Sequence, residues 1–222
     1  RLRCDWSSDV CSSDLKREGL RRETLALILS TAERIFADHG FKGATMQAIA
    51  DGAKLPKANL HYYFPTKKDL YRQVVERIFN IWLDAAESFD TQANPEKALG
   101  TYIRKKMEIS RSHPYGSKVW ANEVIHGAPI IHDYLETTLT EWTDSRIEVI
   151  ERWEAEGLID QVNPRHLLYM IWSTTQHYAD FSHQISTLNG GVPFNDAQWA
   201  EATECVTNII LKGIGVKRGD PS

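Results

Sequence analysis

TMQAIADGAKLPKANLHYYFPTKKDL, residues 45–70, holds two short helical patterns on either side of a break. Apolar residues at helical spacing begin at Met46 in the first pattern and at Leu60 in the second. Between them, Pro56 has a backbone angle suited to the first turn of a helix and pushes Leu55 out of the helical region. Two short helices joined by a tight turn form a helix-turn-helix, whose second helix can enter the DNA major groove. A helical hairpin inside any α-protein fits the same spacing.

The second helix, residues 57–63, favours the DNA-binding interpretation. Its first residues are small or polar, whereas a helix of a protein core would be apolar there. Tyr62 and Tyr63 add two hydroxyl groups that suit phosphate oxygens.

The start of the following helix adds a third argument. Thr66 and Asp69 have the spacing of a capping box, yet Lys67 and Lys68 lie in the same first turn, where a cation opposes the helix dipole. Cations at an unfavourable position, with no compensating contact nearby in the sequence, indicate a functional site. The negative charge of a DNA phosphate backbone would compensate them. The predicted DNA-binding residues are Thr45, Lys57, Ala58, Asn59, His61, Tyr62, Tyr63, Lys67 and Lys68.

These residues resemble the DNA-binding domain of the TetR family of bacterial repressors. The resemblance is carried by the threonine that leads the first helix, the Tyr-Tyr-Phe end of the second, and the lysine-rich start of the next. The family usually has glycine where this chain has Lys54 and serine where it has Pro56, which leaves the turn geometry open. The matching positions are Thr45, Leu60, Tyr62, Tyr63, Phe64, Lys67 and Leu70.

Charge is distributed unevenly along the chain. Residues 16–66 hold eight Lys/Arg and five Asp/Glu, whereas residues 67–222 hold sixteen and twenty-two. A basic N-terminal quarter on an acidic body fits a small DNA-binding domain joined to a body with another task. No apolar run approaches 18 residues and no signal peptide is recognisable, so we expect a soluble, cytoplasmic protein with no membrane association.

Residues 5–15 have the sequence of a translated sequencing-library adapter, and we interpret residues 1–15 as non-native. Without them, Cys205 is the remaining cysteine, so neither a disulfide framework nor a cysteine-based metal site is expected. We predict that Cys205 is a small buried hydrophobe. The histidines show no metal-ligand spacing, and we predict neither a metal nor a cofactor.

Helical periodicity without strand alternation continues to the C-terminus. We therefore predict an all-α fold of about nine helices, with a helix over residues 24–39 completing a three-helix DNA-binding domain at residues 16–66. We expect residues 67–222 to form the effector-binding and dimerisation domain. The helix expected over residues 165–188 is apolar most of the way round, which is typical of burial on several sides. The TetR resemblance implies a homodimer formed through the last two helices.

A stripe of polar and aromatic residues indicates a ligand site. Trp172, Gln176, Asp180 and His183 recur along one face of that helix, where buried polar groups need partners. A pocket for a small polar ligand explains them, and so does an internal polar network or a hydrated rim. A neighbouring helix is interrupted in the same way by Trp120, Asn122, Glu123 and His126.

A closer resemblance, over nearly all of residues 24–215, is to the RutR-type branch of the TetR family. This branch regulates pyrimidine utilisation, which implies a small planar effector such as uracil or thymine. The resemblance implies that Trp82 and Trp172 flank the ring, while Gln176 and Asp180 have the donor and acceptor atoms that an imide edge requires. It is carried by residues 102–104 (YIR), 110–111 (SR), 127–129 (GAP), 170–172 (MIW) and 175–181 (TQHYADF).

The leading hypothesis is a dimeric, ligand-responsive repressor that binds a palindromic operator on double-stranded DNA and is released by its effector. A transcriptional activator, or a sensor of another metabolite, fits the same residues. An alternative of a different class is a helical enzyme using Glu123, His126 and Asp180 as acid and base groups, although no nucleophile motif or phosphate loop accompanies them. The predicted effector-binding residues are Trp82, Trp120, Asn122, Glu123, Trp172, Gln176 and Asp180.

Overall fold

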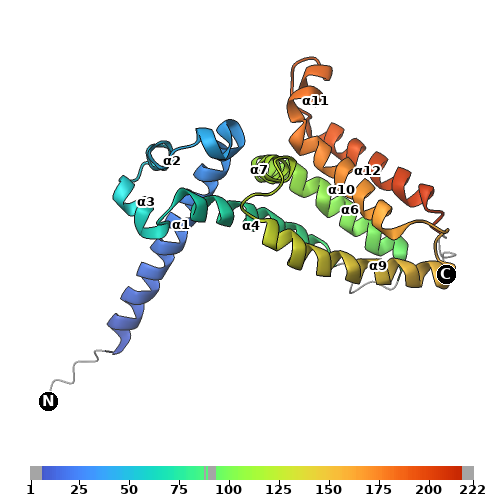
Figure 1. Cartoon of the computed structure of the whole chain (residues 1–222), viewed down its shortest axis with the longest axis horizontal. Helices are drawn as coiled ribbons and strands as arrows, with labels where there is room; N and C mark the ends of the chain where they lie inside the picture. The colour runs from blue at the N-terminus through green and yellow to red at the C-terminus, as the bar shows by residue number, and fades with distance from the viewer. Residues whose placement is uncertain (1–6, 88, 90–93, 217–222) are drawn as a thin grey trace. The chain divides into compact units, whose positions relative to one another are not determined.

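The structure is a computed structural model that describes residues 7–87, 89 and 94–216, with side chains from residue 17 onward (Figure 1). Over these ranges the chain is helical and contains no strand, which confirms the all-α prediction. The chain divides into two compact units between Val74 and Val75. Of the segment interpreted as non-native, residues 1–6 lie outside the described residues, and the first helix begins at Ser7.

The N-terminal unit consists of α1 (Ser7–Gly43), α2 (Met46–Gly52), α3 (Lys57–Tyr63) and the first part of α4 (Lys67–Ala85). The helix predicted over residues 24–39 is thus part of a longer helix, which Gly40 interrupts with a left-handed φ of 65°. α2 packs against both α1 and α3, because a short helix cannot bury a core alone. The buried apolar residues of this unit include Ile28, Ala32, Phe36, Ile49, Leu60, Leu70 and Tyr71.

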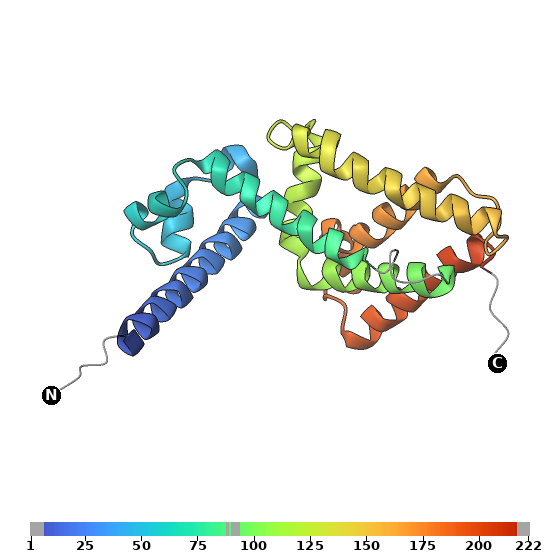
Figure 2. The ribbon, with the colours of Figure 1, turned by 90° about the horizontal axis from the view of Figure 1, so that it is seen from below.

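The C-terminal unit begins with the remainder of α4. α6, α10 and α12 lie side by side in it, with α6 in contact with both others (Figures 1 and 2). The further helices are α6 (Pro95–Ser112), α7 (Pro114–Ile125), α8 (His132–Tyr134), the π-helical turn η1 (Leu135–Leu139), α9 (Thr140–Ala155), α10 (Pro164–Asp180), α11 (Ser182–Leu188) and α12 (Asp196–Gly213).

Asparagine side chains begin three of these helices. Asn94, Asn163 and Asn195 each accept a hydrogen bond from the backbone N–H three residues later, which satisfies an amide that has no partner within the helix. Proline follows the first two at a position where no N–H is required. Local sequence therefore fixes where α6, α10 and α12 start.

Two predictions for the C-terminal unit were wrong. The single helix expected over residues 165–188 is divided at Phe181, whose ψ of 27° departs from helical geometry, into α10 and α11. Cys205, expected to be buried, is exposed on α12, one turn before Ile209, which is 65% exposed. The apolar pattern of α12 therefore extends beyond the side that packs within its own subunit. Within the described ranges, each helix is too short or too polar to cross a lipid bilayer.

Candidate functional site

The geometry of the α2–α3 pair depends on the cap of α2 and on the turn between the two helices. The hydroxyl oxygen of Thr45 accepts a hydrogen bond from the backbone N–H of Ala48 at 3.0 Å, as predicted for the residue that starts α2. Lys54 occupies the left-handed region at φ 56°, so the turn keeps the shape that glycine usually gives it. Pro56 then precedes the first residue of α3 with φ −56°. The sequence thus forms the tight turn of a helix-turn-helix.

Most of α3 faces outward. Leu60 is completely buried and anchors the helix, whereas Tyr62 is 74% exposed and Tyr63 is half-buried against its ring. A short helix with one buried anchor presents its remaining side chains to solvent. The exposed residues, all among those predicted for DNA binding, are Lys57, Ala58, Asn59, His61 and Tyr62.

The two lysines at the start of α4 differ in their surroundings. The predicted capping box is present: the backbone N–H of Thr66 donates to Asp69, and the N–H of Asp69 donates to the Thr66 hydroxyl. Lys67 Nζ donates to the carbonyl oxygens of Phe41 at 2.6 Å and Ala44 at 2.8 Å. The expectation that Lys67 lacks a local partner was therefore wrong, because it ties α4 to the end of α1. Lys68 is exposed.

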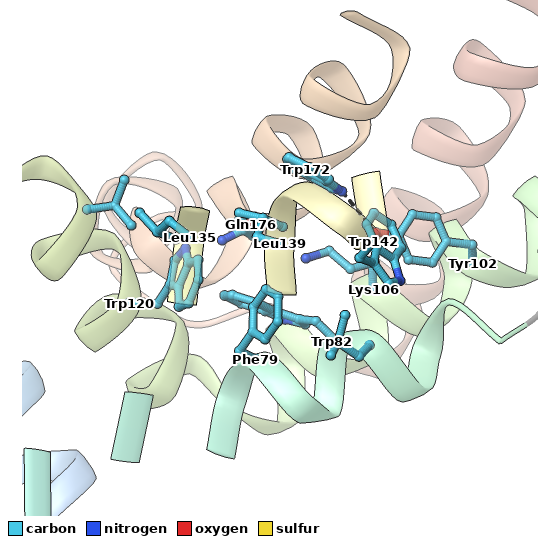
Figure 3. A pocket seen from close by; sticks show the side chains of 12 residues that line it. Phe79, Trp82, Tyr102, Lys106, Trp120, Leu135, Leu139, Trp142, Trp172 and Gln176 are labelled. Carbon is cyan, nitrogen blue, oxygen red and sulfur yellow. Dashed lines mark hydrogen bonds between the residues drawn. The ribbon is translucent and has the colours of Figure 1, made fainter. Parts of the chain in front are cut away.

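A cavity of about 210 Å³ lies within the C-terminal unit (Figure 3). Its walls are largely aromatic, and they come from α4, α6, α7, η1, α9 and α10. Four of the predicted effector residues line it: Trp82, Trp120, Trp172 and Gln176. Eight further residues that were not predicted line it as well: Phe79, Leu83, Tyr102, Lys106, Val124, Leu135, Leu139 and Trp142.

Ring contacts hold the cavity walls in place. Phe79 stacks on Trp120 with ring centroids 5.1 Å apart, and Trp82 meets Trp120 edge-on at 5.4 Å. On the opposite side, Trp172 Nε1 donates to the hydroxyl oxygen of Tyr102 at 2.9 Å. Burial raises the pKa of Tyr102, so its hydroxyl keeps its proton and remains a donor. The cavity is therefore a flat-walled, mainly apolar space with a few polar groups.

Lys106 is the functional candidate that sequence reasoning missed. Its side chain is 2% exposed, and Nζ lies 4.1 Å from the ring centroid of Trp82. Burial lowers its pKa to about 7, against the opposing effect of the Asp180 charge. Its position in the sequence could have indicated its role. Lys106 lies one helical turn after Tyr102 and beside Met107, where the apolar stripe of α6 predicts a core residue.

Three residues predicted for effector binding do not line this cavity. The buried carboxylate of Glu123 accepts the backbone N–H of Ile130 at 2.6 Å, so it closes the loop after α7. Asp180 accepts from the Ser117 hydroxyl at 2.6 Å and thereby joins α10 to α7. Asn122 is half-buried, and its backbone oxygen contacts the His126 ring at 2.7 Å. The alternative of an internal polar network, left open for these side chains, describes Glu123 and Asp180.

Neither the acid–base set of the enzyme alternative nor a metal site is formed by the described residues. Glu123 and Asp180 each bind a structural partner, and His126 is exposed. In the part of the chain that the structure describes, no three His, Cys, Asp or Glu side chains gather closely enough to hold a metal ion.

Comparison with known families identifies the chain. Residues 28–74 match the family model described as bacterial regulatory proteins, tetR family, and residues 75–217 match the YcdC-like protein, C-terminal region. The chain belongs to the TetR family. TetR-family membership makes it a ligand-responsive transcriptional repressor, and confirms the expectation of a regulator rather than an enzyme.

Relatives within the TetR family cover most of the chain. It is 37% identical over 187 residues to the HTH-type transcriptional regulator RutR of Escherichia coli K12, covering 84% of this chain and 88% of that protein. It is 27% identical over 194 residues to the HTH-type transcriptional repressor NicS of Pseudomonas putida, covering 84% and 90%. The resemblance to the RutR-type branch is confirmed.

Solved structures show the same TetR-family fold. AibR, crystallised with isovaleryl coenzyme A and operator DNA, superposes with a TM-score of 0.68 at 18% identity, covering 84% of this chain and 97% of AibR. The regulator PfmR of Thermus thermophilus superposes with a TM-score of 0.66 at 16% identity, covering 86% and 96%. At this identity the likeness concerns the fold alone.

Proposed function

We propose that the chain is a homodimeric repressor that binds a palindromic operator through α3 of each copy and is released by a small pyrimidine. In this proposal residues 16–66 bind DNA, while residues 67–222 bind the effector and form the dimer. The two α3 helices of a dimer would meet half-sites about 34–36 Å apart on the duplex.

The observation that carries the DNA-binding part is the exposure of α3. Leu60 anchors the helix, so the polar side chains of Lys57, Asn59 and His61 are free of the core and can approach base edges. Tyr62 and the exposed Lys68 are placed on the same small unit and suit phosphate oxygens. Lys67 contributes by fixing α4 to α1 in that unit.

Exposed apolar residues on α10 and α12 support the dimer. Met170 and Tyr169 of α10 are exposed, as is Ile209 of α12. Large apolar side chains on neighbouring helices are typical of a surface that a second subunit covers. A dimer through these two helices would bury them.

The cavity supports a single-ring effector. A cavity of about 150 Å³ is large enough for a benzene-sized ring, and this one measures about 210 Å³. The rings of Trp82, Trp120 and Trp172 provide flat walls for stacking. Gln176 supplies both a donor and an acceptor, which an imide edge of uracil or thymine requires.

The response would pass through α4, which contributes residues to both units. Trp82 and Phe79 of α4 line the cavity, whereas Leu70 and Tyr71 belong to the core of the N-terminal unit. An effector shifts the operator-binding equilibrium only by binding one arrangement of α4 more tightly than another.

The test is calorimetry with uracil and thymine, followed by titration of the complex with an operator obtained by selection from random DNA. We expect heat of binding and release of the operator by the same compound. Gln176→Leu should weaken ligand binding at least about tenfold, because it removes the amide that recognises the imide edge. Gln161→Leu, at an exposed position outside the cavity, is the matched control. No heat and no release with either compound would refute the pyrimidine proposal.

A further inference from the structure

Lys106 is a buried amine inside the cavity without a strong acceptor. Figure 3 shows its nitrogen directed into the space between the aromatic walls. Nζ lies over the face of the Trp82 ring, 4.1 Å from its centroid. Over the described residues, Nζ makes no hydrogen bond and no ion pair. The carboxylate of Asp180 interacts with Lys106 through its charge, and one of its oxygens accepts a hydrogen bond from Ser117 at 2.6 Å.

An amine in this position is costly for the folded protein. Burial penalises its charged form and lowers its pKa to about 7, so near neutral pH it is divided between the charged and uncharged forms. A ring face compensates a buried ammonium less well than a hydrogen-bonded oxygen does. An oxygen acceptor brought into the cavity would therefore stabilise the ammonium and be bound strongly by it.

The other polar groups of the cavity complete the pattern. Tyr102 lies one turn before Lys106 on α6, and its oxygen already accepts from Trp172, which leaves its own proton to donate. Gln176, on α10, offers both a donor and an acceptor. The α6 side of the cavity thus presents donors, and a ring that carries an oxygen toward α6 and an N–H toward α10 is complementary to it.

On the basis of the effector site proposed above, we propose that Lys106 is its specificity-determining residue. Its ammonium donates to an oxygen atom carried by a small planar ring, and the uncharged fraction of the amine takes up a proton from solvent as the complex forms. The oxygen belongs to a ring carbonyl, as in uracil, or to a carboxylate on the ring, as in uracil-6-carboxylate.

The proposal gives the sign of a pH dependence. Two titratable groups face Lys106: Asp180 from α10, whose charge favours the ammonium, and Tyr102 from α6, which stays protonated because burial raises its pKa. The lining side chains of α4, α7, η1 and α9 are aromatic or aliphatic. Above pH 7 the free amine is mainly uncharged, so binding requires a proton. The association constant should fall by about tenfold for each pH unit above 7, until the complex itself loses the proton.

The experiment is calorimetry of the full chain with uracil and with uracil-6-carboxylate, at about pH 6 and about pH 8.5. Each titration is run in two buffers of different ionisation heat, which measures the protons taken up. We expect uptake approaching one proton at the higher pH and much less at the lower. Lys106→Met should bind at least about tenfold more weakly at the lower pH and show neither proton uptake nor this pH dependence. Lys105→Met, an exposed neighbour on α6, should behave as the unmodified chain.

A second variant tests the electrostatic part. Asp180→Asn removes the charge that favours the ammonium, so the onset of the pH dependence should move to lower pH. The Lys106 proposal is overturned if Lys106→Met binds as tightly as the unmodified chain, or if the unmodified chain binds without proton uptake at either pH.

A failure of the pyrimidine proposal is distinguishable from a failure of the Lys106 proposal. If neither pyrimidine binds, the same series is run with benzoate, benzamide and toluene, which share a ring and differ in their oxygen. Binding of benzoate or benzamide in preference to toluene, lost in Lys106→Met, supports the role of Lys106 without pyrimidines. Equal binding of all three, or no binding of any, overturns it.

Discussion

The exposed surface of α3 and the aromatic cavity of the C-terminal unit are built in opposite ways. On α3 a single residue, Leu60, is buried, and the side chains assigned to DNA have few other contacts. In the cavity the aromatic lining residues also contact one another, as Phe79 and Trp120 do. Substitutions on α3 should therefore change DNA binding without changing the free energy of unfolding, whereas substitutions in the cavity should change ligand binding and stability together.

Two lysines show the same contrast. Lys67 is partly buried, but its ammonium donates to two carbonyl oxygens and lies 4.5 Å from the ring centroid of Phe41. Lys106 is buried more completely and has the ring of Trp82 in place of oxygens. The first lysine stabilises the unit that contains it, and the second is a cost that the folded chain bears at the proposed ligand site.

The largest predicted effect is stabilisation by Lys106→Met. In the unfolded chain this lysine keeps its proton up to its ordinary pKa of 10.5, whereas in the folded chain it loses the proton near pH 7. Below pH 7 both states are charged and the folded state bears the full penalty. Methionine removes that penalty and fills a similar volume, so the free energy of unfolding should rise by ~3 kcal/mol at about pH 6.

The pH dependence of that stabilisation has a definite sign. Between about pH 7 and 10.5 the unfolded chain binds more protons than the folded chain, so the unmodified protein gains stability as pH rises. The advantage of Lys106→Met should therefore shrink over this range. Urea unfolding of both proteins at about pH 6 and about pH 9 measures it. A constant difference, or a loss of stability at the lower pH, would show that the amine is not a buried, unpaired cation.

The second effect concerns Lys67 and its neighbour. Lys67→Met removes two hydrogen bonds from a charged donor, so the free energy of unfolding should fall by about 2 kcal/mol. Lys68→Met should leave stability unchanged, because Lys68 is exposed. If Lys68 contacts a phosphate, its substitution should lower the slope of log K against log salt for operator binding by about 1. Equal stability losses in the two variants would contradict the roles assigned here.

A third substitution tests how tightly the cavity unit is packed. A Cβ atom placed on Gly116 of α7 would lie 3.2 Å from three side-chain carbons of Ile78 on α4. Gly116→Ala should therefore lower the free energy of unfolding by about 1–2 kcal/mol, since a close-packed core accommodates an added methyl group at a cost. Gly213→Ala is the control, because a Cβ atom at that position would meet open space. Gly127 is unsuitable, because its φ of 84° strains any other residue. An unchanged unfolding midpoint would show that α7 and α4 separate readily.

The sequence predicted the helix-turn-helix better than the cavity, for a physical reason. Thr45, Pro56 and the Thr66–Asp69 box act on backbone within four residues of themselves, so their geometry can be derived from spacing. Contacts between residues far apart in the sequence could not be derived from spacing. Lys67, for example, donates to carbonyl oxygens more than twenty residues away. Lys67 does oppose the helix dipole, but the carbonyl oxygens that compensate its charge lie within the fold.

The residues that line the cavity come from six helical elements. Periodicity predicts which side of each helix is buried, but it does not predict which other helix packs against that side. Spacing therefore identified Trp172 and Gln176 on α10 but placed Asp180 with them, although that carboxylate turns to Ser117. Tyr102 and Lys106 were missed because a helix that is buried on most sides gives no sign of which residues face a cavity. A charged residue inside an apolar stripe was the one usable signal.

The smallest predicted change in stability, and the sharpest test of the contrast, is Tyr62→Ala. The side chain is 74% exposed and contacts the Tyr63 ring edge-on, so the free energy of unfolding should change by no more than about 0.5 kcal/mol. Operator affinity should nevertheless fall by about tenfold, which corresponds to the loss of one good phosphate contact, while uracil binding stays unchanged. Fluorescence anisotropy with labelled operator and urea unfolding of the same sample measure the two quantities. A variant that loses both stability and DNA binding would mean that α3 depends on Tyr62 for its fold, and the separation between an exposed DNA-binding surface and a packed ligand cavity would not hold.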